Sequence, residues 1–445
     1  MLFRMLSRWL GSSSERSRQG LPVRRRRTIV PRLETLENRF VPAFLAPEEL
    51  LGVPSGAIVK VGDINNDSRP DIVTAQGSNL NVSVYWSPGV YTQTFHASLA
   101  APIKDVAVGK INADAYDDVV VATGEKTLNI FLGRSDGRVG APIRVTMPKA
   151  PYSTMQFALN LALGDVTGDG KMDLVVGAES STYKDNHPGF GYYNIDLRDS
   201  LATVLVGKGD GTFRTGSTVW LDTHGIYSSG APTPFRVPVA IGDVNGDGKR
   251  DVVAASFGQY AYLEMPPLKL LGDYHVHLLT GDGQGKFQKD ATLWANGTPW
   301  SRSFQDSGYG LPVLAVRDLN GDGRDDIVAA YPGGYQGGTS LHISVSDPST
   351  GQFVTTGYAF SGTPAAVAVD DVTGDGKLDI VVATRGGGVE VQPGNGDGTF
   401  QAAQTFAPGA SFTAMILSDL DRDGDVDLIL LDGTSAFQML NNQPW

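Results

Sequence analysis

The sequence predicts an all-β protein in which seven similar four-stranded sheets close into a ring. A nine-residue acidic loop, close to D-x-[NTD]-x-D-G-x-x-D, recurs along the chain, and short apolar runs flank each copy. Such repetition is typical of stacked or circular units, and the two ends of the chain can share one sheet. These observations predict a seven-bladed β-propeller. Six nearly intact copies begin at Asp63, Asp165, Asp243, Asp318, Asp371 and Asp419, and a degraded copy begins at Lys110.

The composition agrees with many short strands and tight turns. Glycine makes up 55 of 445 residues, well above the usual share of about 7%. The chain has no run of 18 apolar residues, so we expect no membrane-spanning helix. It has no cysteine, which excludes disulfides and thiolate metal sites.

The N-terminal segment differs in charge from the rest of the chain. Residues 1–43 carry a net charge of +7, and the remaining residues carry −19. Because residues 44–445 are acidic, we expect no nucleic-acid partner. The stretch Pro31–Ala43, PRLETLENRFVPA, resembles the L-E-x-L-E-x-R-x-x-P-A segment of exported planctomycete proteins. The resemblance implies that residues 1–43 are an export segment, removed or disordered, and that residues 44–445 form a secreted or cell-surface propeller.

The spacing of the acidic loops gives the size of each blade. Successive copies begin 47, 55, 78, 75, 53 and 48 residues apart, and a four-stranded blade takes roughly 40–50 residues. In the sixth repeat, strands A, B and C are expected at 367–369, 380–383 and 389–391. A G-D-G-T turn at 396–399 then leads into strand D at Phe400.

Ring closure follows from the two ends. The last repeat supplies strands near 414–416, 428–430 and 437–439 but no fourth strand. Phe44 precedes Asp63 by 19 residues, as Phe400 precedes Asp419. The segment 44–54 is therefore expected to complete the seventh blade, which removes an exposed sheet edge.

The acidic loop has the ligand set of a calcium site. A hard cation takes six to eight oxygens, which a tight loop can supply from alternating positions. In the fourth copy these are the side chains of Asp243, Asn245 and Asp247, the carbonyl of Lys249 and the carboxylate of Asp251. The glycine at position 6 allows the sharp turn.

The loops and the G-D-G-T-F turns together resemble the FG-GAP, or VCBS, repeats of integrin α-subunit propellers and of many exported bacterial proteins. The resemblance covers about 400 residues and implies that five further loops bind calcium in the same way. Those candidate ligands are Asp63, Asn65, Asp67, Arg69 and Asp71; Asp165, Thr167, Asp169, Lys171 and Asp173; Asp318, Asn320, Asp322, Arg324 and Asp326; Asp371, Thr373, Asp375, Lys377 and Asp379; and Asp419, Asp421, Asp423, Asp425 and Asp427.

Two copies depart from the pattern, so we expect about six calcium ions rather than seven. Ser68 replaces the turn glycine of the first loop, which weakens binding without abolishing it. Lys110 replaces the first aspartate of the second loop, and its ammonium group is expected to neutralise Asp114 and Asp118 in place of a cation. Calcium is expected to be structural, because clustered carboxylates repel one another unless a cation offsets them.

The long spacings come from inserts in blades 3 and 4, at about 179–199, 214–236, 257–273 and 288–311. The A–B and C–D turns of a blade lie on one face, so these B–C and D–A connections are expected on the opposite face. They contain many aromatic residues, which form either a carbohydrate or peptide platform or a set of anchors that pin the inserts to the ring. The platform candidates are Tyr192, Tyr193, Trp220, Tyr227, Tyr260, Trp294, Trp300 and Tyr309.

No G-x-S-x-G, H-E-x-x-H or P-loop motif is present. His275 and His277 share a strand face, and we expect them to be exposed polar residues rather than a metal site. Three readings remain: a binding or adhesion module with an extracellular carbohydrate or protein ligand, a scaffold, or a carbohydrate-active enzyme of the polysaccharide-lyase kind. Such an enzyme would need paired carboxylates, for which the inserts offer Asp222, Glu264 and Asp306.

Overall fold

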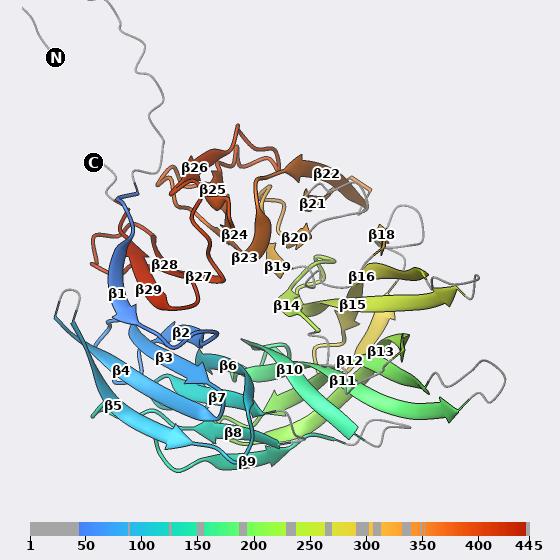
Figure 1. Ribbon diagram of the computed structural model, residues 1–445, viewed down its shortest axis with the longest axis horizontal. Coiled ribbons are helices and arrows are strands. Elements are labelled where there is room, and N and C mark those ends of the chain that lie inside the picture. Colours follow the sequence, from blue (N-terminus) through green and yellow to red (C-terminus); the bar gives the residue numbers. More distant parts are fainter. Residues whose placement is uncertain are drawn as a thin grey trace, which may run out of the picture. The chain divides into compact units, whose positions relative to one another are not determined.

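The described strands of the computed structural model form a ring of seven sheets (Figure 1). They belong to one compact unit, Phe40–Trp445. Within the described residues, no helix is long and apolar enough to span a membrane. The structure describes residues 44–87, 90–123, 127–148, 155–186, 194–227, 237–262, 269–290, 302–305, 313–331, 340–347, 349–350 and 352–441.

Each sheet is one blade, and its antiparallel strands A to D follow one another in the chain except where the ring closes. The loops that begin at Asp63, Lys110, Asp165 and Asp243 belong to blades 1, 2, 3 and 4. Blade 1 has β2 (Ile58–Gly62), β3 (Asp71–Gln76), β4 (Asn79–Ser87) and β5 (Val90–Ser98). Blade 2 has β6 (Ile103–Gly109), β7 (Asp118–Thr123), β8 (Thr127–Phe131) and β9 (Ile143–Thr146). Blade 3 has β10 (Met155–Gly164), β11 (Asp173–Asn186), β12 (Asn194–Gly207) and β13 (Phe213–Tyr227). Blade 4 has β14 (Val239–Gly242), β15 (Asp251–Tyr262), β16 (Lys269–Gly281), β17 (Phe287–Asp290) and β18 (Arg302–Gln305).

The remaining three blades carry the loops that begin at Asp318, Asp371 and Asp419. Blade 5 has β19 (Val313–Arg317), β20 (Asp326–Tyr331), β21 (Ser340–Ser346) and β22 (Phe353–Ala359). Blade 6 has β23 (Thr363–Asp370), β24 (Asp379–Arg385), β25 (Gly388–Gln392) and β26 (Gln404–Phe406). Blade 7 has β27 (Ala414–Ser418), β28 (Asp427–Leu431), β29 (Ser435–Met439) and β1 (Glu48–Gly52).

The predicted ring closure is confirmed. Strand β1 pairs with β29 in antiparallel register (Figure 1). Phe44 forms an isolated bridge with Asn441. The ring of Phe44 also meets that of Phe406 in blade 6 edge to face, with centroids 5.2 Å apart. The N-terminal part of the propeller therefore supplies the outer strand of the last blade.

Two strand predictions need correction. Strand D of blade 6 begins at Gln404 rather than at Phe400, which makes only an isolated bridge with Gly394. Much of the inserted sequence in blades 3 and 4 is not loop, because it lengthens strands β11, β12, β13, β15 and β16. These strands reach outward at the right of Figure 1.

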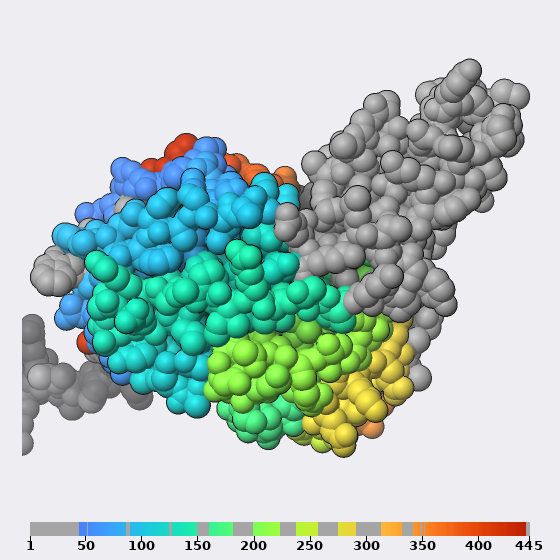
Figure 2. All heavy atoms as spheres, turned by 90° about the horizontal axis from the view of Figure 1, so that it is seen from below, coloured from blue at the N-terminus to red at the C-terminus, as the bar shows by residue number. Residues whose placement is uncertain are grey.

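The core lies between neighbouring blades. Strand B of blade 2 is fully buried over Asp118–Thr123 because blades on either side cover both of its faces. One apolar cluster joins blade 2 to blade 3 through Val120, Leu128 and Leu174. Figure 2 shows successive blades side by side on the described surface, from blue through green to yellow.

The acidic loops and the C–D turns lie on one face, as the strand parity predicts. In blade 4, Gly242 pairs with Asp251 at the loop and Gly281 pairs with Phe287 at the turn. The loop of blade 2 also meets the C–D turn of blade 3, because the amide of Ala113 donates to the carbonyl of Gly209 over 3.0 Å.

Candidate metal-binding loops

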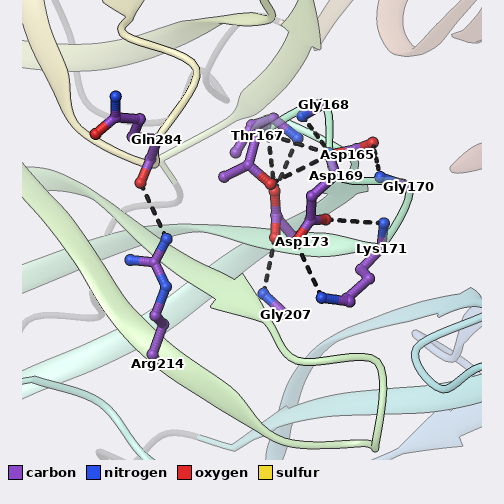
Figure 3. A network of polar contacts seen from close by, with 11 residues as sticks. Asp165, Thr167, Gly168, Asp169, Gly170, Lys171, Asp173, Gly207, Arg214 and Gln284 are labelled. Carbon is purple, nitrogen blue, oxygen red and sulfur yellow. Dashed lines mark hydrogen bonds and ion pairs between the residues drawn. The ribbon is translucent and has the colours of Figure 1, made fainter.

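The aspartate at position 9 of every loop is completely buried, and both of its carboxylate oxygens accept backbone hydrogen bonds. In blade 3, Asp173 Oδ2 accepts the amide of Val166 at 2.9 Å and Oδ1 accepts the amide of Gly207 at 2.7 Å. Gly207 ends strand C, so the carboxylate ties the loop to the third strand of its own blade (Figure 3). The same pattern recurs at Asp71, Asp118, Asp251, Asp326, Asp379 and Asp427.

The aspartate at position 1 organises the turn itself. Asp165 Oδ1 accepts the amide of Gly168 at 2.7 Å, and its Oδ2 accepts the amide of Gly170 at 2.7 Å (Figure 3). Asp243 and Asp318 make the corresponding bonds in blades 4 and 5. The loop therefore wraps its amides around this carboxylate and leaves the side chains of positions 3 and 5 facing the same small space.

Two loop positions have left-handed backbone, not one. Position 4 and position 6 both have positive φ, as at Gly246 (φ 73°) and Gly248 (φ 81°). In the first loop Ser68 keeps the turn with φ 62°, and in the last loop Arg422 occupies position 4 with φ 67°. The first loop thus retains its shape without glycine, at the cost that a left-handed non-glycine residue carries.

The copy that begins at Lys110 has a different structure. The residues with positive φ include neither Ala113 nor Ala115, which fill positions 4 and 6 of this described loop. The expectation that Lys110 neutralises Asp114 and Asp118 is wrong, because no ion pair joins it to either residue in the described part of the chain. Burial raises the pKa of Asp117 instead, and the Lys110 ammonium opposes part of that rise.

Oxygen atoms that could hold a hard cation lie close together in the loop of blade 7. In blade 7 one carboxylate oxygen from each of Asp419, Asp421 and Asp427 lies within 4.8 Å of the others. The buried Oγ1 of Thr373, at position 3 in blade 6, has no hydrogen-bond partner of good geometry among the described residues. In three loops the lysine at position 7 approaches position 5, for example Lys249 Nζ at 3.3 Å from Asp247 Oδ2. Ion pairs near the surface contribute little to stability, so these would not compete strongly with a bound cation.

Several position-9 carboxyl groups have a raised pKa, mainly because they are buried. Burial, with a smaller contribution from the neighbouring aspartates Asp67 and Asp63, raises the pKa of Asp71 to about 7. Burial likewise raises the pKa of Asp326 to about 7 and that of Asp251, Asp379 and Asp427 to about 6. A bound dication would oppose each rise, because an opposite charge within a few ångströms favours the ionised carboxylate.

Position 8 supplies a contact between blades that the sequence analysis missed. Asp117 Oδ2 accepts the amide of Asp63 at 2.8 Å, and the amide of Asp117 donates to the Asp63 carbonyl at 3.0 Å. Asp325 of blade 5 forms the same two hydrogen bonds with Asp243 of blade 4. Arg250 Nη1 lies 2.9 Å from Asp325 Oδ2. The sequence feature that could have predicted this contact is a pair of adjacent aspartates at positions 8 and 9, which occurs in these two copies.

Trp220 is the one platform candidate whose side chain the structure describes. Trp220 is 51% exposed and lies on β13, the outer strand of blade 3, rather than in a connection. Its Nε1 donates to Asp199 Oδ1 at 3.2 Å, and Lys289 Nζ lies 5.5 Å from the ring centre. The backbone of Tyr227 and Tyr260 lies in β13 and β15. The other candidates, Tyr192, Tyr193, Trp294, Trp300 and Tyr309, lie outside the described residues.

The prediction for the histidine pair is wrong about exposure. His277 is buried, with 3% of its surface accessible, and His275 is mostly covered. Both contact Asp222, one of the three carboxylates considered for catalysis. Glu264 and Asp306 lie outside the described residues. The alternation of His275 and His277 placed them on one face, but the sequence did not show that blade 3 covers that face.

Comparison with known proteins agrees with the repeat analysis. A model of the FG-GAP-like repeat family matches residues 110–176, 318–382 and 371–430. No curated protein sequence matches the chain significantly. The fold is similar to a lectin from Agrocybe aegerita that recognises non-reducing terminal N-acetylglucosamine, at 18% identity over 79% of this chain and 80% of that chain, with a TM-score of 0.49.

Two further solved structures are similar at lower identity. One is Saccharomyces cerevisiae Sqt1, at 10% identity over 90% of this chain and 100% of that chain, with a TM-score of 0.46. The other is the Dos1 propeller, at 11% identity over 84% of this chain and 76% of that chain, with a TM-score of 0.41. With acidic loops in phase in all seven blades and a ring closed by β1, this chain is a seven-bladed β-propeller that contains FG-GAP-like repeats.

Proposed function

We propose that this propeller is an exported binding or adhesion module whose six intact loops hold structural calcium. The observation that carries the calcium proposal is the convergence of carboxylate oxygens at positions 1, 3 and 9 of the loop in blade 7. Asp419, Asp421 and Asp427 place three carboxylate oxygens within 4.8 Å. Such a group repels itself unless a cation offsets the charge, and oxygen-only donors select calcium over softer metals.

Bound calcium would act on the ring rather than on a substrate. Positions 1, 3 and 5 would contribute side-chain oxygens, position 7 a carbonyl and position 9 a buried carboxylate. The position-9 carboxylate is already bonded to strand C of its own blade or to the residue two positions after it, so the ion would link the A–B loop to the end of strand C. The ligand would then bind elsewhere on a stiffened ring, and the lengthened strands of blades 3 and 4 are the part of the ring that differs most from the other blades.

Calcium content and thermal stability test the first half of this proposal. We expect about six ions per chain by equilibrium dialysis and a substantially lower melting temperature in excess chelator, restored by calcium. Stability is expected to rise because a ligand that binds only the folded state shifts the unfolding equilibrium. An unchanged melting curve in chelator would refute structural calcium.

A glycan array, run with and without calcium, tests the second half. Binding without turnover supports a module for carbohydrate, and release of cleaved product supports the enzyme alternative. No binding to any glycan on the array would direct the search to protein ligands on cell surfaces. The proposed export rests on the resemblance of Pro31–Ala43, and fractionation of the native host tests it: a purely cytoplasmic protein would contradict it.

A further inference from the structure

A cluster of polar side chains lies at the seam between blades 3 and 4, away from the acidic loops. Asp222 comes from β13, the outer strand of blade 3, whereas His275 and His277 come from β16 in blade 4. Asp222 Oδ2 lies 2.7 Å from His275 Nδ1 and 3.0 Å from His277 Nε2. One donor atom from each of the three residues lies within 4.8 Å of the other two. Ser256 of β15 adds its hydroxyl, 2.8 Å from His277 Nε2 and hydrogen-bonded to Asp222.

The arrangement does not fit a proton relay. In a serine hydrolase the histidine uses one ring nitrogen for the serine and the other for the carboxylate. Here the same atom, His277 Nε2, faces both Ser256 and Asp222. A proton taken from the serine could not cross the ring to the aspartate. The groups instead direct their donor atoms toward one point, as metal ligands do.

The environment of His277 is compatible with a cation. Burial lowers the pKa of its ring, and neutral imidazole is the form that binds metal. Its other nitrogen, Nδ1, has no hydrogen-bond partner in the described part of the chain. The ring can therefore carry its proton on Nδ1 and present the lone pair of Nε2 to a metal. The side chains of Asp222 and His275 are each 17% exposed, which leaves a route for an ion to enter.

We propose that Asp222, His275 and His277 bind one first-row transition-metal dication of the zinc type and thereby fasten blade 3 to blade 4. Two imidazole nitrogens and one carboxylate oxygen suit zinc, whereas calcium prefers oxygen alone. Zinc bonds of about 2.0–2.1 Å in a tetrahedron set the donors about 3.3 Å apart. The observed separations of 2.7 and 3.0 Å therefore need to widen by about 0.6 and about 0.3 Å. Ser256 or a water molecule completes the coordination.

Lys289 lies at the edge of the proposed site. Its ammonium group donates to the carbonyl of Leu221 at 2.8 Å and lies over the ring of Trp220. It is thus bonded to blade 3 beside Asp222 without forming an ion pair with that carboxylate. The charge of Lys289 still acts on Asp222 and His277 through space, and a bound metal would replace the hydrogen bonds that Asp222 makes with His275, His277 and Ser256.

The test uses the full-length protein in millimolar calcium, so that the acidic loops are saturated before zinc is added. Zinc is titrated by calorimetry and cobalt(II) by its visible absorption, which reports nitrogen ligation. The variants are His275→Gln, His277→Gln and Asp222→Asn, with His96→Gln as the control. His96 is an exposed histidine on β5 in blade 1.

We expect one zinc ion per chain in the wild type and in His96→Gln, with a raised melting temperature in both. Each of the three site variants should bind more than about 100-fold more weakly, since even outer-shell partners of a metal are typically worth 10–100-fold. Zinc should then leave their melting temperatures unchanged. Equal zinc affinity in His275→Gln and the wild type, or no zinc binding by the wild type, would overturn the proposal. If His277→Gln fails to fold, the partly exposed His275 and Asp222 variants decide, after circular dichroism confirms their strand content.

Discussion

Replacing Asp118 with alanine should destabilise the propeller without any loss of bound calcium. Asp118 is the position-9 residue of the copy that begins at Lys110, which we expect to hold no ion. Its Oδ2 accepts the amides of Ile111 and Asn112 at 2.9 and 3.1 Å, and its Oδ1 accepts that of Gly133 at 2.8 Å. The residue is 0% exposed, so bulk water cannot take over these bonds.

The expected cost follows from the three amides left without an acceptor. A buried backbone donor that loses its partner costs about 1–3 kcal/mol. Removal of the carboxylate also relieves the desolvation that raises its pKa. We therefore expect the free energy of unfolding to fall by about 3–5 kcal/mol. Asp114→Ala, at the exposed position 5 of the same loop, should cost less than about 1 kcal/mol.

The assay is denaturant unfolding of each variant in calcium and in chelator. Asp118→Ala should lose the same free energy in both conditions. Asp251→Ala, the matched change in blade 4, removes three comparable bonds and a calcium ligand, so its loss should be larger in calcium than in chelator. A cost below about 1 kcal/mol for Asp118→Ala would refute the structural role of position 9. A calcium-dependent cost would refute the view that this loop holds no ion.

Three further predictions concern pH, a glycine and the degraded loop. In excess chelator, the free energy of unfolding should fall as pH rises from 5 to 8. Burial raises the pKa of five position-9 carboxyl groups to about 6 or 7. Stability that depends on their protonation is lost as pH passes the folded-state pKa. The lowered pKa of His277 acts in the opposite sense but is one group against five, and greater stability at pH 8 than at pH 5 would contradict this reasoning. Gly207→Ala should cost at least about 1–3 kcal/mol in a melt, because its Cβ would lie 2.1 Å from a carbonyl oxygen of the acidic loop; Gly357→Ala, with open space around it, is the control that should be near neutral. Lys110→Asp combined with Ala115→Gly should add one calcium ion per chain by equilibrium dialysis, and an unchanged count would show that the loop needs more than its first ligand and its turn.

The sequence predicted the number of blades and their order because the acidic loop occurs in phase in every repeat. Its spacing located strands A and B around each copy, and the distance from Phe44 to Asp63 matched that from Phe400 to Asp419. The prediction failed where the repeat has no fixed length. The inserts of blades 3 and 4 contain no turn signal strong enough to separate a longer strand from a loop, so their extended hairpins were missed.

The roles of individual side chains were harder to predict, because they depend on contacts between distant parts of the chain. A motif shows that position 9 is an aspartate, but not that Oδ1 bonds to strand C, or to the residue two positions after it, some 14 to 34 residues later. Similarly, the pairing of His275 and His277 with Asp222 joins residues more than 50 positions apart. Spacing along one strand cannot predict such a contact across two blades.

The copy that begins at Lys110 separates the two tasks of the acidic loop. It has lost the first carboxylate and both left-handed positions, yet Asp118 keeps its bonds to the loop and to Gly133, two residues after strand C. If this copy holds no ion, as we expect, position 9 closes a blade without a cation, and position 1 is needed only where an ion is enclosed. If this division holds in every blade, chelation should loosen the loop face while the sheets stay paired. Amide exchange in chelator should then increase at positions 4 to 6 of the six intact loops and remain slow in strand B.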